Sequence, residues 1–131
     1  ALDKFGRTLK DGWHPLDEAT LRLFSRGATD GAIFFESDKM REWLFDFDPE
    51  SMSDLVLLNA LYWPGRIGLF PEILRRKQCG DYGKEYRDTY GVPVYQEQTG
   101  DPNLAPKGHF IGRTMMAVEA LWPYRNKTKL K

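Results

Sequence analysis

The sequence MSDLVLLNALY, residues 52–62, decides the fold. Its apolar side chains recur at the spacing of a helix, at Met52, Leu55, Val56, Leu58, Leu61 and Tyr62. Asp48-Pro49-Glu50-Ser51 precedes the run and Pro64-Gly65 follows it, and both are sequences at which helices typically begin or end. The pattern therefore predicts a helix between Ser51 and Pro64.

Four further helices are predicted on either side of this stretch. Each predicted helix is bordered, at one end or both, by a residue of a type that commonly caps or terminates helices. The expected ranges are 18–26 after Asp17 and before Gly27, 38–45 with Ser37 or Asp38 as the cap, 70–77 before Gly80, and 110–122 before Pro123. These ranges predict a mainly α fold.

The connecting segments give weaker patterns. Residues 31–35 form a short apolar run that fits either a strand or a buried turn. Residues 84–89 fit one or two helical turns, residues 92–95 look extended because of Pro93, and residues 98–107 read as a loop. We expect a single small helical domain over residues 1–131, with room for one short β-hairpin.

Composition argues for a globular chain without the usual charge of a nucleic-acid binder. Apolar residues make up 41% of the 131 residues and aromatic residues 14%. The formal net charge is zero, whereas free-standing nucleic-acid binders are usually basic. Charge is nevertheless uneven, because residues 36–54 hold seven acids and two bases while residues 101–131 hold six bases and two acids. The basic third is either a phosphate-binding surface or a solubilising tail.

Cysteine and histidine are too few for disulfide or zinc chemistry. Cys79 is the only cysteine, and His14 and His109 are the only histidines. The acids of residues 36–54 lie on opposite faces of at least two predicted helices, so no metal site is predicted there. There is no apolar run of membrane-spanning length and no signal pattern, and Ala1 suggests a processed or trimmed start. We expect a cytoplasmic protein with no membrane partner and no cofactor.

Two groups of cations are candidate phosphate-binding residues. Arg75, Arg76 and Lys77 lie at a predicted helix end, where they either bind phosphate or interact favourably with the helix C-terminus. Lys107, His109 and Arg113 lie at the start of the last predicted helix. Free backbone N–H groups there favour anions, so these side chains make either a triphosphate cradle or an ordinary exposed helix start.

Tyr95, Gln96 and Gln98 form a third candidate group, within the sequence TYGVPVYQEQ of residues 89–98. Tyr95 could stack on a base, and the two amides could hydrogen-bond a base edge or a sugar. The alternative is a buried corner in which the amides bond to neighbouring protein groups.

Residues 89–98 closely resemble the T-Y-G-x-x-V-Y-Q-E-Q signature of the alpha subunit of bacterial DNA polymerase III, the C family of replicative polymerases. Other blocks of the chain resemble the same family in the same order. They include LFSRGATDG at 23–31, DPES at 48–51, LNALY at 58–62, PG at 64–65, RRK at 75–77 and PKGH at 106–109. Together these blocks cover most of the chain.

The resemblance implies the helical fingers region, which in this family holds the incoming nucleotide and the template end. It implies nucleotide or DNA contacts for the three candidate groups, and it makes Asp3 a possible match to one palm carboxylate. The family's active-site carboxylate pair is missing, and only residues 99–106 separate Gln98 from Lys107, where the family has a longer segment. Magnesium is expected only in a complete family member.

We therefore expect an internally shortened fragment or divergent relative of this polymerase. It should bind DNA or a nucleoside triphosphate weakly and should not polymerise on its own. The alternative is a structural protein, in which a polymerase-derived fold serves as one of the protein subunits of a larger assembly.

Overall fold

Helix α3 (Met52–Leu61) is the centre of the molecule. The computed structural model describes residues 16–80 and 82–124. All residues of α3 except Ser53 are buried. A helix that is apolar on every side must be covered on every side, so the remaining helices pack around it.

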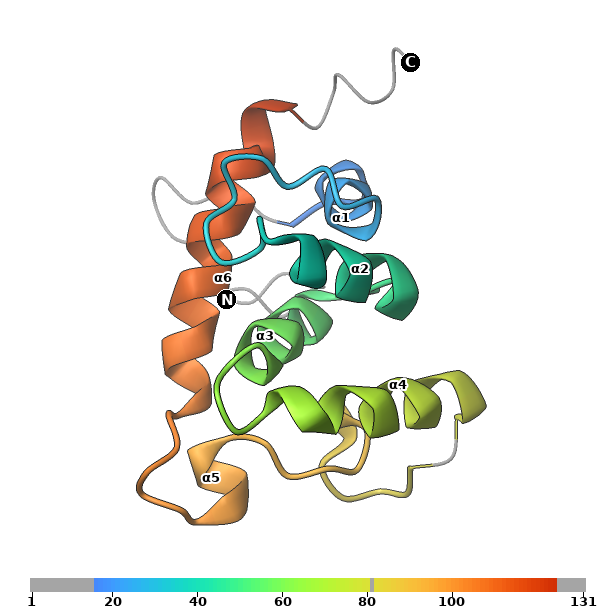
Figure 1. Ribbon diagram of the computed structural model, residues 1–131, viewed down its shortest axis with the longest axis vertical. Coiled ribbons are helices and arrows are strands. Elements are labelled where there is room, and N and C mark those ends of the chain that lie inside the picture. Colours follow the sequence, from blue (N-terminus) through green and yellow to red (C-terminus); the bar gives the residue numbers. More distant parts are fainter. Residues whose placement is uncertain (1–15, 81, 125–131) are drawn as a thin grey trace.

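The other elements form a stack beside one long helix (Figure 1). They are α1 (Glu18–Ser25), α2 (Asp38–Phe47), η1 (Ile67–Leu69), α4 (Phe70–Cys79), η2 (Arg87–Thr89), α5 (Gln96–Thr99), α6 (Lys107–Leu121) and η3 (Trp122–Tyr124). Helix α6 runs along the stack and packs against α3 and α1. Helices α2 and α4 lie on either side of α3 in this view, and α5 lies at the end of the molecule where α6 begins.

Side-chain caps hold the first three helices; Asp17 is the predicted cap of α1, and Ser37 is one of the two candidates predicted for α2. The side chains of Asp17, Ser37 and Ser51 accept hydrogen bonds from backbone N–H groups three residues ahead, at 2.8, 3.1 and 3.2 Å. Each bond satisfies a donor that the first turn of a helix leaves free. Gly80 ends α4 in the left-handed conformation, as a glycine after a helix is expected to do.

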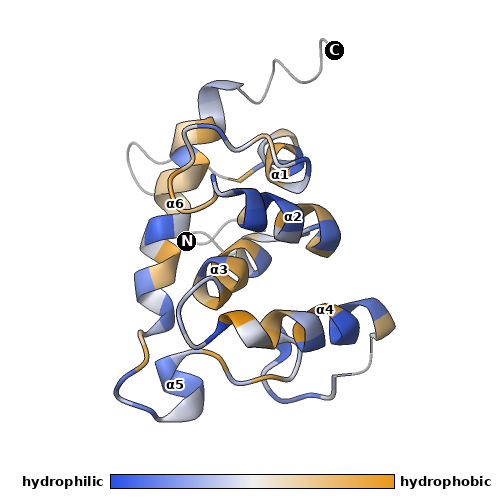
Figure 2. Cartoon of the chain, viewed as in Figure 1, coloured by the Kyte–Doolittle hydropathy of each residue, from blue (hydrophilic) through white to orange (hydrophobic). Residues whose placement is uncertain are grey.

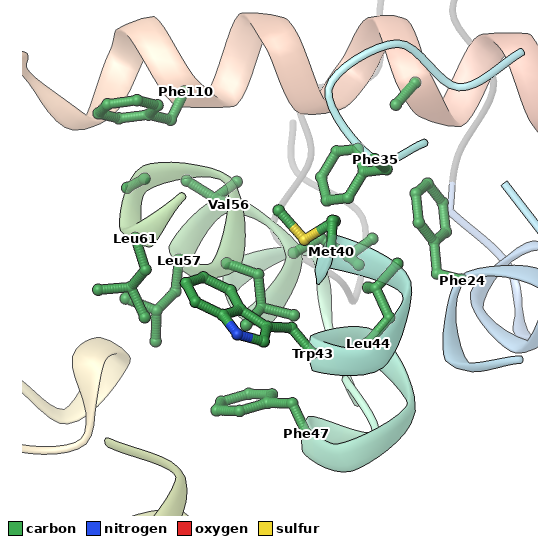
Figure 3. Close-up of a cluster of buried hydrophobic side chains, with 14 of the residues drawn as sticks. Phe24, Phe35, Met40, Trp43, Leu44, Phe47, Val56, Leu57, Leu61 and Phe110 are labelled. Atoms are coloured by element: carbon green, nitrogen blue, oxygen red, sulfur yellow. The ribbon is translucent and has the colours of Figure 1, made fainter. Parts of the chain in front are cut away.

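One hydrophobic core joins these helices. Apolar surface is concentrated on α3 and on the inward faces of its neighbours (Figure 2). Aromatic side chains connect the layers: Phe24 meets Phe35 edge to face at 5.2 Å, and Trp43 of α2 stacks on Phe70 of α4 at 4.2 Å (Figure 3 shows Phe24, Phe35 and Trp43). Such pairs add to the free energy gained by burying their area.

The mainly α prediction is confirmed, whereas several predicted segments differ. Among residues 16–80 and 82–124 there is no strand, so the short hairpin that the sequence allowed is not formed there. Residues 31–35 make turns, with Phe34 at a φ of 76°. The predicted loop after residue 98 begins inside α5, and α6 starts at Lys107 rather than near Phe110. Pro106 is compatible with this early start, because proline has no backbone N–H and the residue before a helix needs none as a helical donor.

None of the helices in the described ranges combines the length and the apolar character that a bilayer span requires.

Candidate functional site

Arg75 and Arg76 share one carboxylate on the exposed side of α4. Glu72 accepts hydrogen bonds from Arg75 Nε at 3.1 Å, Arg75 Nη2 at 2.7 Å and Arg76 Nε at 2.7 Å. These bonds lower the pKa of Glu72 to about 2. Two guanidinium groups on one carboxylate leave an excess of positive charge, which is compatible with a phosphate contact.

Lys77 points away from this pair and toward the end of α2. Its Nζ donates to the backbone carbonyls of Phe47 at 2.7 Å and Asp48 at 3.2 Å, and it lies 3.1 Å from Glu50. Its side chain is only 13% exposed. A lysine that satisfies the last carbonyls of a helix has a structural role, so the three consecutive cations do not form one surface.

Gln98 holds the corner formed by residues 89–98. Its Oε1 accepts from the backbone N–H groups of Val94 at 2.7 Å and Tyr95 at 2.9 Å, and its Nε2 donates to Thr89 at 2.9 Å. Tyr95 is 2% exposed and packs near Phe110. The structure thus presents these two residues as a buried corner. Their predicted contacts with a base or a sugar stay predictions.

Gln96 and Lys107 lie on either side of that corner. Gln96 is partly exposed, and its Nε2 lies 3.5 Å from the carbonyl of Pro102. The backbone N–H of Lys107 donates to both carboxylate oxygens of Glu97, at 3.0 and 3.1 Å, so a protein carboxylate already occupies the start of α6. The Lys107 ammonium group lies 3.3 Å from Asp88. An incoming phosphate would compete with both carboxylates.

His109 and Arg113 face a different side, one turn apart on α6. The Arg113 guanidinium stacks on the ring of Phe34 at 3.5 Å, lies 5.5 Å from the ring of Trp63, and contacts His109 at 3.4 Å. No carboxylate in the described part of the chain pairs with Arg113. Desolvation lowers the pKa of Arg113 from its usual value. Within residues 16–80 and 82–124, this arginine is therefore a cation without a paired carboxylate, beside an exposed aromatic ring.

A pocket of about 320 Å³ opens next to this arginine. Its lining residues are Phe34, Glu36, Ser37, Asn59, Tyr62 and Arg113. Two buried polar atoms on these residues have no hydrogen-bond partner: the Oδ1 atom of Asn59 and the Nε atom of Arg113. Buried polar groups are normally paired, so an unpaired acceptor and an unpaired donor at one pocket favour a ligand that carries both functions.

The structure brings together only part of the predicted site. His109 and Arg113 are neighbours, while Lys107 turns to Asp88 and the Arg75–Arg76 pair lies on α4. Sequence reasoning missed Phe34, Asn59 and Trp63, which surround Arg113. The one available signal was Asn59, a polar residue inside an otherwise apolar helix.

Metal-binding chemistry has no support in the described ranges. Asp3 lies outside the described residues, so its predicted role as a palm carboxylate stays a prediction. Within residues 16–80 and 82–124, no three His, Cys, Asp or Glu side chains are positioned to share a metal ion. The carboxylates there do not fit the two-metal site that phosphoryl transfer uses.

Comparison with known proteins gives the family. The sequence profile of the bacterial DNA polymerase III alpha subunit finger domain matches residues 13–101. Curated relatives named DNA polymerase III subunit alpha include one from Borreliella burgdorferi, 37% identical over 80% of this chain, and one from Xylella fastidiosa strain 9a5c, 39% identical over 82%. A third, from Halalkalibacterium halodurans, is 34% identical over 91% of the chain.

The matched region is a small part of those proteins. It covers 10% of the Borreliella and Xylella relatives and 12% of the Halalkalibacterium relative. The order of the matching blocks, the helical fold and the profile match agree with one another. The chain belongs to the family of bacterial DNA polymerase III alpha subunits, and its matched region corresponds to the finger domain of that family.

Proposed function

We propose that this chain binds the phosphate groups of a nucleoside triphosphate or of DNA weakly, through the surface around His109 and Arg113, and does not polymerise on its own. The observation that carries the proposal is the Arg113 guanidinium, which pairs with no carboxylate in the described ranges and lies beside the exposed ring of Trp63. Arginine binds phosphate through a planar fork of donors, and an aromatic ring next to it offers a base a surface for stacking.

The remaining predicted residues have supporting roles in this proposal. Arg75 and Arg76 carry more positive charge than Glu72 neutralises, so they favour a DNA backbone. Lys107 can join only by leaving Asp88. Polymerisation needs carboxylates that converge on two metal ions, so we propose that magnesium acts only in a complete family member. We propose that the chain acts in the bacterial cytoplasm, where the chromosome is replicated.

The test is a titration of the purified chain with deoxyadenosine triphosphate and, separately, with a short single-stranded DNA, followed by tryptophan fluorescence at low and high salt. We expect weak, salt-sensitive binding. Arg113→Gln should weaken it about tenfold, the usual effect of removing a charge-assisted hydrogen bond. Circular dichroism should confirm that the variant is folded, because Arg113 packs on Phe34.

Arg26→Gln is the matched control, because it removes the same charge from an exposed position at the end of α1. Equal loss in both variants would mean that binding follows net charge alone and would contradict the proposed site. Absence of salt-sensitive binding by the unmodified chain would contradict the proposed function. Primer extension with magnesium should give no product, and efficient extension would overturn the second half of the proposal.

A further inference from the structure

A second groove, whose lining residues differ from those of the pocket beside Arg113, is not used by the proposed function. It lies between α2 and the junction of η1 with α4, and its volume is about 420 Å³. Trp43, Phe70 and Pro71 give it an apolar lining, together with Ile67, which is 44% exposed. Phe45, on the adjoining outer face of α2, is 72% exposed.

Two carboxylates line the α2 side of this groove. Glu42 and Asp46 are one helical turn apart, so they share a face and repel each other. Neither forms an ion pair with any residue in ranges 16–80 and 82–124, although Lys39 lies on the same side of α2. Asp46 is also in the last turn of α2, where the helix dipole disfavours negative charge and no basic residue is present.

These charges are unfavourable for the isolated chain. Repulsion between Glu42 and Asp46 reduces the stability of the helix, and no ion pair of either carboxylate in ranges 16–80 and 82–124 offsets it. Lys77 donates to the carbonyls of Phe47 and Asp48 and so offsets the dipole at the end of α2, but it forms no ion pair with Asp46. An unfavourable local arrangement next to an apolar groove is typical of a surface that a partner completes. The missing partner must supply positive charge and an apolar side chain.

We propose that this groove docks a segment of another protein in which a large apolar side chain is flanked by lysine or arginine. The apolar side chain enters between Trp43 and Ile67, and the flanking cations pair with Glu42 and Asp46. Nucleic acid and anionic lipid are disfavoured here, because their phosphates would meet two carboxylates that have no counter-charge. The docking surface therefore differs in chemistry from the surface around Arg113.

The experiment titrates the full chain with three blocked peptides: acetyl-KKLKK-amide, acetyl-KKSKK-amide and acetyl-EELEE-amide. Binding is read from the indole N–H resonance of Trp43, assigned by comparison with Trp43→Phe. The lysine–leucine peptide should shift this resonance in a saturable, salt-sensitive way, and the other two peptides should bind at least about fivefold more weakly. Equal binding of all three peptides, or no shift with any of them, would overturn the proposal.

Variants separate docking from folding. Glu42→Gln and Asp46→Asn should each weaken binding of the lysine–leucine peptide, together by about fivefold or more, the range for two exposed ion pairs. The same variants should raise the midpoint of urea unfolding, because each removes an unfavourable charge from α2. Glu85→Gln is the matched control, an exposed carboxylate in the segment before η2 that should change neither quantity.

Two further results would count against the proposal. Peptide binding that is unchanged in both α2 variants would show that the carboxylates are not the contact. Tighter peptide binding by a chain that lacks residues 125–131, which carry four cations, would assign the groove to the chain's own C-terminal residues instead of an external partner.

Discussion

The hydroxyl group of Tyr90 donates a 2.7 Å hydrogen bond to the buried carboxylate of Asp54 on α3. The other oxygen of Asp54 accepts from the backbone N–H of Glu50 at 2.9 Å. Tyr90 also packs edge to face against Phe47 at 5.7 Å and Tyr82 at 5.1 Å. This residue of the TYG sequence therefore anchors the segment around η2 to the centre of the core.

Removing the Tyr90 hydroxyl should destabilise the chain. In Tyr90→Phe the ring contacts remain, but one oxygen of the buried Asp54 loses its partner. We expect the free energy of unfolding to fall by about 1–3 kcal/mol, the cost of an unsatisfied buried polar group. Urea unfolding followed by circular dichroism measures this change. Tyr86→Phe is the control, since the exposed Tyr86 hydroxyl makes only a 3.5 Å contact; an equal loss there would refute the explanation.

The Asp54 carboxyl should make stability depend on pH in the direction opposite to most carboxylates. Burial raises its pKa above 3.8, although the bonds from Glu50 and Tyr90 lower it in part. The folded state thus holds this proton more tightly than the unfolded chain does. The contribution of Asp54 to the free energy of unfolding is full below pH 3.8 and falls as the pH rises through its folded pKa.

Asp54→Asn tests this pH dependence, because an amide does not titrate. The difference in free energy of unfolding, unmodified chain minus variant, should decrease as the pH rises above 3.8 and then become constant. Urea unfolding at a series of pH values gives the difference. A difference that increases over that range would mean that the folded state favours the ionised carboxylate.

Gly91 should not tolerate a side chain. Its φ is +83°, and a Cβ atom would lie 2.6 Å from the carbonyl oxygen of Tyr82 and 2.8 Å from Nη1 of Arg76. Gly91→Ala should therefore cost both left-handed strain and a steric clash, about 2–4 kcal/mol in unfolding free energy. Gly83→Ala is the matched control, because Gly83 also has a positive φ but open space around it. It should cost only about 1–2 kcal/mol, and equal costs would show that the clash is relieved.

Lys77 should matter for stability, while Arg75 should not. Lys77→Met keeps an apolar stem but removes the donor to the carbonyls of Phe47 and Asp48, which should lower the free energy of unfolding by about 1–3 kcal/mol. Arg75→Gln changes an exposed ion pair and should leave the unfolding midpoint nearly unchanged. Thermal and urea unfolding of both variants checks this difference. A larger loss of unfolding free energy in Arg75→Gln than in Lys77→Met would mean that the exposed ion pair of Arg75 stabilises the fold more than the Lys77 contacts do.

Helix positions were the most predictable part of this protein. The cap Asp17 could be identified, and Ser37 could be named as one of two candidates, because a cap acts on a backbone N–H only three residues away. Helix ends were less accurate: α2 extends to Phe47 and α6 begins at Lys107, because contacts with other helices decide how far each last turn continues. The loop predicted from residue 98 onward overlaps the second half of α5, whose corner is held by the Gln98 side chain accepting from the backbone N–H groups of Val94 and Tyr95.

The candidate site was only partly predictable. Arg75, Arg76 and Lys77 are adjacent in sequence, but successive helical residues point in different directions, so two bind Glu72 and one binds the end of α2. The aromatic rings beside Arg113 come from residues 34 and 63, and residue 59 lines the same pocket. No short-range pattern links residues so far apart in the chain.

The amino-acid sequence by itself determined the helical class, the cap of the first helix and the family, because each of these depends on residue types at short, regular spacing or in a shared order along the chain. The tertiary structure alone decided which cations are already neutralised, which polar atoms lack a partner, and that Tyr90 is joined to Asp54. Those properties depend on distances between residues that the folded core brings together, and sequence separation does not report such distances.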